Sequence, residues 1–218
     1  MIDPFIDFGR EICGNLEAAE QREWLVTNGL GGFASGTIAG SLTRRYHGLL
    51  IAALQPPLGR TLLVAKLAET AEYDAQSFPL STDRWTDGTV APRGYLNLER
   101  FRLEGTTPVW TFAFADALLE KRVWMRHGSN TTYVRYDLVR SSGALKLTLR
   151  ALVNYRNYHS LTRAGAGAGA WRMDIQPVEH GLRVTALEGA APFYLLGASA
   201  RRSEERRVGK ECRSRWSP

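Results

Sequence analysis

The stretch that decides the fold is Glu23 to Ile51, which reads EWLVTNGLGGFASGTIAGSLTRRYHGLLI. Glycines at positions 29, 31, 32, 36, 40 and 48 interrupt residues that otherwise have the composition of β-strands. Each glycine adds chain entropy that folding must overcome, so a plain hairpin has no need of so many. This density indicates unusual backbone angles, or a backbone that another group approaches closely. We therefore predict a functional edge here, with a backbone loop that comprises Asn28, Gly29, Gly31, Gly32 and Gly36.

A polar and aromatic cluster, Arg44, Arg45, Tyr46 and His47, stands directly before the last of these glycines. Guanidinium groups present fixed forks of donors that suit sugar hydroxyls and carboxylates. Tyrosine adds a flat apolar face and a hydroxyl, so the cluster is a candidate for direct contact with a sugar. A structural interpretation stays open, in which an arginine pairs with a carboxylate at a domain interface, Tyr46 is core and His47 is a hydrogen-bonded strut.

Short strands separated by turns account for most of the remaining chain. Asn28-Gly29 is a strong hairpin signal between the expected strands 23–27 and 33–38. Leucines at 145, 147 and 149 alternate with polar residues, which is the period of a strand. Further strands are expected at residues 48–54, 62–68, 101–103, 110–114, 134–138, 182–187 and 192–196, and a turn or two of helix within 16–24. This pattern predicts an all-β fold, an antiparallel β-sandwich.

A second polar and aromatic cluster, NYRNYH at residues 154–159, follows the expected strand 145–153. A position at the end of a strand suits a loop that faces a cleft, so Arg156 and His159 are further candidates for substrate or interface contact. A surface loop anchored by one of its tyrosines explains the same pattern. No cofactor is expected, and no metal site either, because the Cys, His and carboxylate residues lack the spacing of a zinc site.

The two clusters carry a resemblance to a known family. The matching residues are Trp24, Asn28-Gly29, Gly31-Gly32-Phe33-Ala34, Gly36-Thr37, Arg44-Arg45-Tyr46-His47-Gly48-Leu49-Leu50 and Asn154-Tyr155-Arg156-Asn157-Tyr158-His159. Over residues 5–200 the chain resembles the N-terminal domain of bacterial and archaeal glycogen debranching enzymes, of the amylo-α-1,6-glucosidase type. At position 157 the family more often has Asp. The resemblance implies a parent enzyme that hydrolyses α-1,6 branch linkages in glycogen-like glucans, with its catalytic acids in a C-terminal α/α barrel that this chain lacks.

Glycoside hydrolysis needs a general acid and a second carboxylate at a fixed separation. The acidic residues of the expected strands and turns are scattered, and no two are marked as a pair: Glu99, Glu104, Asp116, Glu120 and Asp137. We therefore expect a non-catalytic domain that packs on the barrel, shapes one wall of the cleft and orients the α-glucan. The alternatives are a stand-alone glucan-binding module, a purely structural domain, or the equivalent domain of a glucoamylase or disaccharide phosphorylase.

The last residues, 202–218, read RSEERRVGKECRSRWSP and break the strand pattern. This string resembles the translation of a sequencing-library adapter, so we expect a domain at residues 1–201 and a non-native tail at 202–218. The sandwich is then expected to be truncated at its C-terminal end. The tail carries six basic and three acidic residues, and without it the chain has 22 basic and 19 acidic residues. The net charge falls from +6 to +3, which suggests no nucleic-acid partner.

Cysteine usage and the N-terminus bear on the compartment. Only Cys13 lies outside the suspect tail, so no internal disulfide is expected, which fits a reducing cytoplasm. The start, MIDP, lacks the basic and apolar regions of a signal peptide. No stretch has the apolar length of a membrane span, so we expect a cytoplasmic protein without a membrane partner.

Overall fold

The computed structural model describes residues 6–161 and 173–197. The strands are β1 (Asp7–Phe8), β2 (Glu23–Thr27), β3 (Phe33–Thr37), β4 (Gly48–Gln55), β5 (Leu58–Tyr73), β6 (Gln76–Pro79), β7 (Thr82–Arg84), β8 (Val90–Arg93), β9 (Leu98–Glu104), β10 (Thr107–Phe114), β11 (Ala117–Met125), β12 (Thr132–Arg140), β13 (Lys146–Asn157), β14 (Asp174–Val178), β15 (Gly181–Thr185) and β16 (Phe193–Leu196). The helices are α1 (Arg10–Cys13), α2 (Leu16–Glu20) and the 3₁₀ helix η1 (Gly94–Asn97). The expected tail at 202–218 lies outside the described residues.

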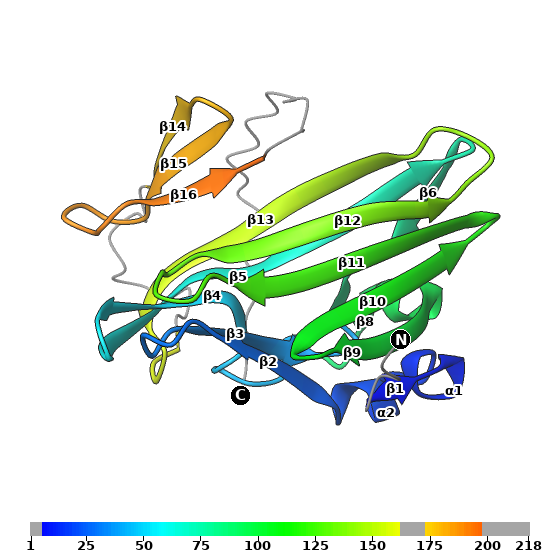
Figure 1. The fold of residues 1–218 in the computed structure, drawn as a ribbon, viewed down its shortest axis with the longest axis horizontal. Helices are drawn as coiled ribbons and strands as arrows, with labels where there is room; N and C mark the ends of the chain where they lie inside the picture. Colours follow the sequence, from blue (N-terminus) through cyan, green and yellow to red (C-terminus); the bar gives the residue numbers. More distant parts are fainter. Residues whose placement is uncertain (1–5, 162–172, 198–218) are drawn as a thin grey trace.

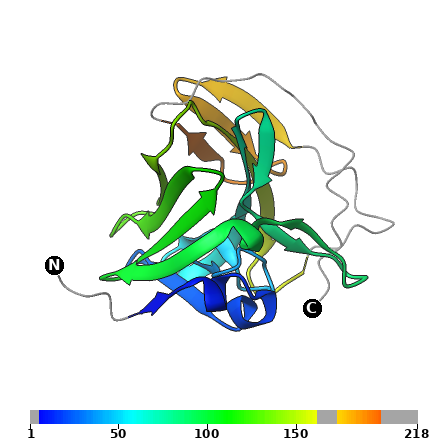
Figure 2. The same cartoon turned by 90° about the vertical axis from the view of Figure 1, so that its right-hand side faces the viewer.

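Two antiparallel sheets form the body of the molecule (Figure 1). The first sheet has the strand order β1-β9-β10-β11-β12, and the second has β13-β5-β4-β3-β2 with β6 attached to β5. A small sheet, β14-β15-β16, lies at the end of the molecule opposite to α1 and α2 (Figures 1 and 2). The prediction of an all-β, sandwich-like fold is confirmed.

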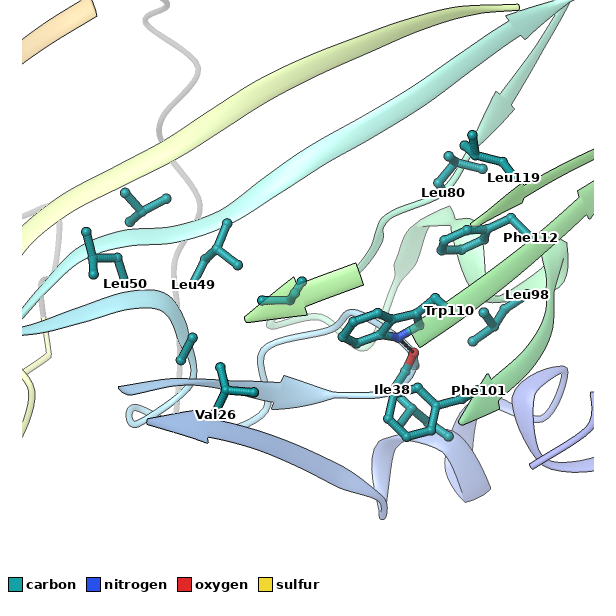
Figure 3. Packing of buried hydrophobic residues seen from close by; sticks show 14 of the residues in the cluster. Val26, Ile38, Leu49, Leu50, Leu80, Leu98, Phe101, Trp110, Phe112 and Leu119 are labelled. Atoms are coloured by element: carbon teal, nitrogen blue, oxygen red, sulfur yellow. Dashed lines mark hydrogen bonds between the residues drawn. The ribbon is translucent and has the colours of Figure 1, made fainter. Parts of the chain in front are cut away.

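The main core lies between the two sheets, and Trp110 of β10 is its anchor (Figure 3). Its ring meets Trp24 of β2 and Phe101 of β9 edge to face, each at 5.2 Å between ring centroids. Its indole N–H donates to the carbonyl of Ile38, 3.0 Å away, so the one polar atom of the ring is satisfied. Loss of an aromatic side chain from such a core costs about 3–5 kcal/mol. Trp110 therefore ties the first sheet to the second.

The second sheet also buries side chains on its other face. The first six residues of β4 are buried, which means that both faces of this strand are covered. Ile51 packs there with Leu62 of β5 in a separate apolar cluster. Leu42, from the connection between β3 and β4, and Tyr158, from the turn after β13, cover this cluster. The second polar-aromatic cluster and the segment that leads into the first therefore share one apolar base.

Several boundaries differ from those expected from sequence. β5 runs for 16 residues and β13 continues to Asn157, because each strand pairs with the other along most of its length. Arg156 consequently lies in a strand and not in a loop. β16 forms as expected, but Tyr194 and Leu196 are 54% and 68% exposed, so the strand is not buried as a whole. α2 confirms the short helix expected within residues 16–24.

Candidate functional site

Two segments far apart in sequence meet at one place, which we call the rim cluster: Arg45, Tyr46, Arg156, Tyr158 and His159. Arg156 Nη2 donates to the carbonyl of Arg45, 2.6 Å away. Arg45 Nη1 donates to the carbonyl of His159 at 3.0 Å, and the Tyr46 hydroxyl is 3.2 Å from His159 Nδ1. The structure thus brings together residues of both motifs that the sequence marks as candidates.

Strand pairing positions the two segments. Tyr46 lies two residues before the start of β4, and its carbonyl accepts a hydrogen bond from the Ser35 hydroxyl of β3 at 3.0 Å. Arg156 is opposite Leu62 of β5, and the chain stays attached to β5 beyond the end of β13, because Tyr158 N donates to the carbonyl of residue 60 at 3.1 Å. Since β3, β4, β5 and β13 are neighbours in one sheet, the rim cluster stands on a rigid element.

Three rings pack together at the centre of the rim cluster. The Tyr46 ring is 5.5 Å from that of Tyr158 and 5.7 Å from that of His159, between centroids. Tyr158 and His159 are 3.9 Å apart, with their planes tilted by 41°. Tyr46 remains 37% exposed, and His159 is exposed as well. The cluster therefore offers aromatic surface with polar edges to the solvent.

Arg156 acts as a clamp inside the rim cluster. Its Nη1 donates to the carbonyls of Asn157, Tyr158 and Ser160, at 3.3, 3.2 and 2.6 Å. Its Nη2 reaches the other motif at Arg45. Burial lowers the pKa of Arg156, and the positive charge of Arg45 lowers it further. The hydrogen bonds of this guanidinium group therefore hold the turn after β13 against the segment before β4.

The arginines of the rim cluster, and Arg60 beside it, have carbonyl and ring partners. The Arg45 guanidinium carbon lies 5.5 Å from the centroid of the Tyr46 ring, within the range of a cation–π contact. Arg60 lies equally close to Tyr158 and also donates to its hydroxyl at 3.2 Å. Among the described residues, no carboxylate forms an ion pair with Arg45, Arg60 or Arg156. Their charge is therefore not offset within this part of the chain.

Arg44 and His47 both contact Glu23 instead, Arg44 from an exposed position and His47 from a buried one. Arg44 Nε is 2.6 Å from Glu23 Oε1, in an ion pair. His47 is buried, and its Nδ1 accepts hydrogen bonds from the backbone N–H of Thr43 and of Arg44 at 3.1 and 3.3 Å. In a neutral imidazole the proton is then on Nε2, which is 3.3 Å from Glu23 Oε1 without an aligned hydrogen bond. Burial lowers the pKa of His47, which the charge of Glu23 opposes. Both side chains hold the turn that presents Arg45 and Tyr46.

Asn28 is a buried hydrogen-bonding hub at the other end of β2. Its amide nitrogen donates to the carbonyl of Ser129 and to Asn130 Oδ1, at 3.1 and 2.9 Å. Its side-chain oxygen accepts from the backbone N–H of Leu30 and Gly32, at 2.9 and 3.0 Å. The residue expected at the tip of a hairpin therefore ties the β2–β3 loop to the β11–β12 hairpin.

The glycines of this loop lie where backbones converge. Gly29 and Gly31 have φ values of +77° and +93°, which L side chains rarely adopt. A Cβ at Gly29 would collide with the His127 imidazole, and one at Gly31 would lie 2.7 Å from the Pro57 carbonyl oxygen. The Gly31 carbonyl accepts from Arg60 Nε at 2.7 Å, so the loop supports the rim cluster through Arg60. Gly36 lies apart from this loop, beneath the Trp24 ring.

Arg60 and Glu23 also belong to the site, although the sequence interpretation did not name them as candidates. Arg60 is a basic residue near the start of an apolar strand, just after a proline turn, and this anomaly is the signal that could have found it. Glu23 reaches Arg44 and His47 only through the pairing of β2 with β3 and of β3 with β4. No local pattern encodes that contact.

The scattered carboxylates are largely engaged with arginines on the face of the first sheet that is turned away from the core. We call these residues the ion-pair network: Glu104, Glu120, Asp137, Arg102, Arg122 and Arg135. The hydrogen bond from Arg122 lowers the pKa of Glu104. Burial opposes the same shift at Glu120, but its arginine partners lower that pKa as well. A general acid at neutral pH needs a raised pKa, so these two shifts run in the opposite direction.

Two further properties bear on function. Within residues 6–161 and 173–197, no group of three His, Cys, Asp or Glu side chains could hold a metal ion. No helix in the described ranges is long and apolar enough to cross a membrane.

Comparison with known proteins identifies the family. No curated protein and no solved structure matches the chain. A family model described as "Glycogen debranching enzyme N terminal" matches residues 22–211, a range that contains both motifs of the rim cluster. Because this match covers most of the chain, the protein belongs to the family of glycogen debranching enzyme N-terminal domains.

Proposed function

We propose that this chain is the non-catalytic N-terminal domain of a glycogen debranching enzyme, which packs on a catalytic barrel and presents the rim cluster to an α-glucan. Family membership supports the class of enzyme. The observation that carries the proposal is the convergence of two distant motifs on one partly exposed surface of rings and guanidinium groups.

The chemistry of the rim cluster suits a sugar. The exposed part of the Tyr46 ring can pack on the CH-rich face of a glucose unit, while its hydroxyl and His159 supply polar contacts. The Arg156 clamp and the ring packing hold these groups before a ligand arrives, which lowers the entropic cost of binding. In the parent enzyme such binding would act by positioning the glucan at a distant reacting centre.

The proposed role is non-catalytic because Glu104 and Glu120 serve the ion-pair network and have lowered pKa values. Purified chain incubated with a branched limit dextrin should release no glucose. Measurable release that survives repurification would contradict this part of the proposal. The proposal includes a cytoplasmic location, because Cys13 is a buried free thiol, as is usual in a reducing compartment, and burial raises its pKa to about 11.

Calorimetric titration of the 218-residue chain with maltoheptaose tests the sugar contact. Tyr46→Ala should weaken binding by about two- to tenfold, the effect expected for one aromatic contact. Tyr133→Ala is the matched control, because Tyr133 is 40% exposed and stacks on Trp124 in the first sheet, at 5.3 Å. Equal weakening of binding in both variants, or no weakening in either, would contradict the assignment of sugar contact to the rim cluster.

A further inference from the structure

The rim cluster carries more positive charge than a neutral glucan can use. Among the described residues, Arg45, Arg60 and Arg156 have hydrogen bonds to carbonyls and a tyrosine hydroxyl, but no ion pair with a carboxylate. The charges also oppose one another, since Arg45 lowers the pKa of Arg156. An anion at this place would relieve that repulsion, whereas a sugar hydroxyl would not.

Of these three arginines, one has two guanidinium nitrogens without a partner among the described residues. Arg156 uses both terminal nitrogens on four carbonyls, and Arg60 uses Nε and Nη1. Arg45 uses only Nη1, so Nε and Nη2 have no partner among the described residues. Arg45 is also exposed. We propose that Arg45 is the docking point for a carboxylate on an acidic protein surface; that this surface is the catalytic domain's rests on the proposed function.

The arrangement favours a carboxylate over a phosphate. Phosphate sites gather several convergent donors, commonly with backbone N–H groups among them. Here the nearby backbone N–H groups of Thr43 and Arg44 already donate to His47 Nδ1. Arg60 and Arg156 each use two of their three guanidinium nitrogens, so neither has a free two-nitrogen edge. The two free nitrogens of Arg45 match the two oxygens of a single carboxylate, a pairing that the planar fork of arginine makes well.

The docked carboxylate has a consequence for the rings. Arg45 lies over Tyr46, and its Nη1 holds the backbone of His159. An ion pair at the free edge of Arg45 would fix the guanidinium in this position. The partner surface would then stand beside the exposed part of Tyr46, so the sugar-facing ring and the protein-facing charge would occupy adjacent places on one rim.

The test is an NMR titration of the 218-residue chain at low ionic strength, read at the arginine Nε–Hε signals. Hexaglutamate peptide is the carboxylate probe, and inorganic phosphate and maltoheptaose are added separately at matched ionic strength. We expect hexaglutamate to shift the Arg45 signal in a saturable manner, and phosphate to shift it less. No saturable shift at Arg45, or a larger one with phosphate, would overturn the proposal.

Variants distinguish recognition by the planar guanidinium group of Arg45 from general electrostatic attraction. Arg45→Gln should weaken hexaglutamate binding by about two- to fivefold, the size of an exposed ion pair, and Arg45→Lys should recover only part of it. Arg135→Gln is the control, because this exposed arginine already pairs with Asp137 on the first sheet. An equal loss in Arg135→Gln, or full recovery in Arg45→Lys, would overturn the proposal. Hexaglutamate binding without maltoheptaose binding would contradict only the sugar contact, and the reverse would contradict only the carboxylate site.

Discussion

In the ion-pair network of the first sheet, Arg122 contacts Glu104, Glu120 and Asp137 at 3.3, 2.7 and 3.1 Å, whereas Arg45 at the rim cluster has no carboxylate partner among the described residues. Both regions lie on sheet faces away from the main core, and both are rich in arginine. The first region offsets its charges internally and is complete in itself. The second holds its guanidinium groups in place with carbonyls and rings, and no carboxylate among the described residues offsets their charge. The difference separates arginines whose charge is offset within the domain from arginines that we propose face a partner.

The largest expected effect on stability is at an ion pair inside the sandwich, where the two charges offset each other. Glu69 of β5 is buried, with Lys121 Nζ of β11 at 2.6 Å and the Tyr136 hydroxyl donating to it. Glu69→Gln leaves Lys121 without a counter-charge, so the free energy of unfolding should fall by about 3 kcal/mol. Urea unfolding followed by tryptophan fluorescence measures this change. A loss below about 0.5 kcal/mol would mean that solvent screens this pair like a surface one.

A smaller loss is expected within the ion-pair network. Glu120 is partly buried and pairs with Arg102 and Arg122 at 2.9 and 2.7 Å. Glu120→Gln should lower the free energy of unfolding by about 1–2 kcal/mol, between the values for exposed and buried pairs. Glu72→Gln is the control, because Glu72 and its partner Lys146 are both exposed, and its effect should be close to zero. Equal effects for the two variants would show that the network has no special stability.

The turn that supports the rim cluster should respond to pH. Folding lowers the pKa of His47 below its ordinary value of 6.5, so the unfolded chain binds more protons there as the pH falls. His47 therefore disfavours the folded state increasingly as the pH drops below 6.5 and through the lowered folded pKa. The slope for this one group is at most about 1.4 kcal/mol per pH unit. In His47→Gln that contribution should vanish, as thermal unfolding between pH 7 and 5 can show. An unchanged pH profile would place His47 in solvent.

The smallest effect on stability is expected at the rim itself. Arg45→Gln removes a charge that has no carboxylate partner among the described residues and that opposes Arg156. The free energy of unfolding should change by less than about 0.5 kcal/mol, or rise slightly. The same urea titration as for Glu69→Gln measures it. A loss above 1 kcal/mol would mean that Arg45 stabilises the fold, and the comparison between the two regions would fail.

The alternation of apolar residues predicted the strands and the sandwich because a half-buried strand repeats every two residues. The positions of Arg45, Tyr46, Arg156 and His159 in two motifs also identified most of the rim cluster. Their contact across more than 100 positions depends on β13 pairing with β5, a register that no local pattern specifies. The sequence interpretation of the glycines was right about close backbone approach at Gly29 and Gly31 but could not name their neighbours.

The contacts of Arg44 and His47 with Glu23 were equally hidden in the sequence. Arg44 and Arg45 are adjacent, chemically identical and both exposed, yet Arg44 pairs with Glu23 and Arg45 has no carboxylate partner among the described residues. The turn geometry decides between them, since its backbone N–H groups are fixed by His47 Nδ1. A side chain with a carboxylate partner and one without such a partner among the described residues can therefore have the same residue type and neighbouring numbers.

A crystal structure of the chain soaked with maltoheptaose tests the central claim most directly, namely that the rim cluster is a glucan-facing surface. The account predicts a glucose unit stacked on the exposed part of Tyr46, with its hydroxyls near His159. A sugar bound at the Trp124–Tyr133 pair of the first sheet, with the rim cluster empty at saturating ligand, would contradict it.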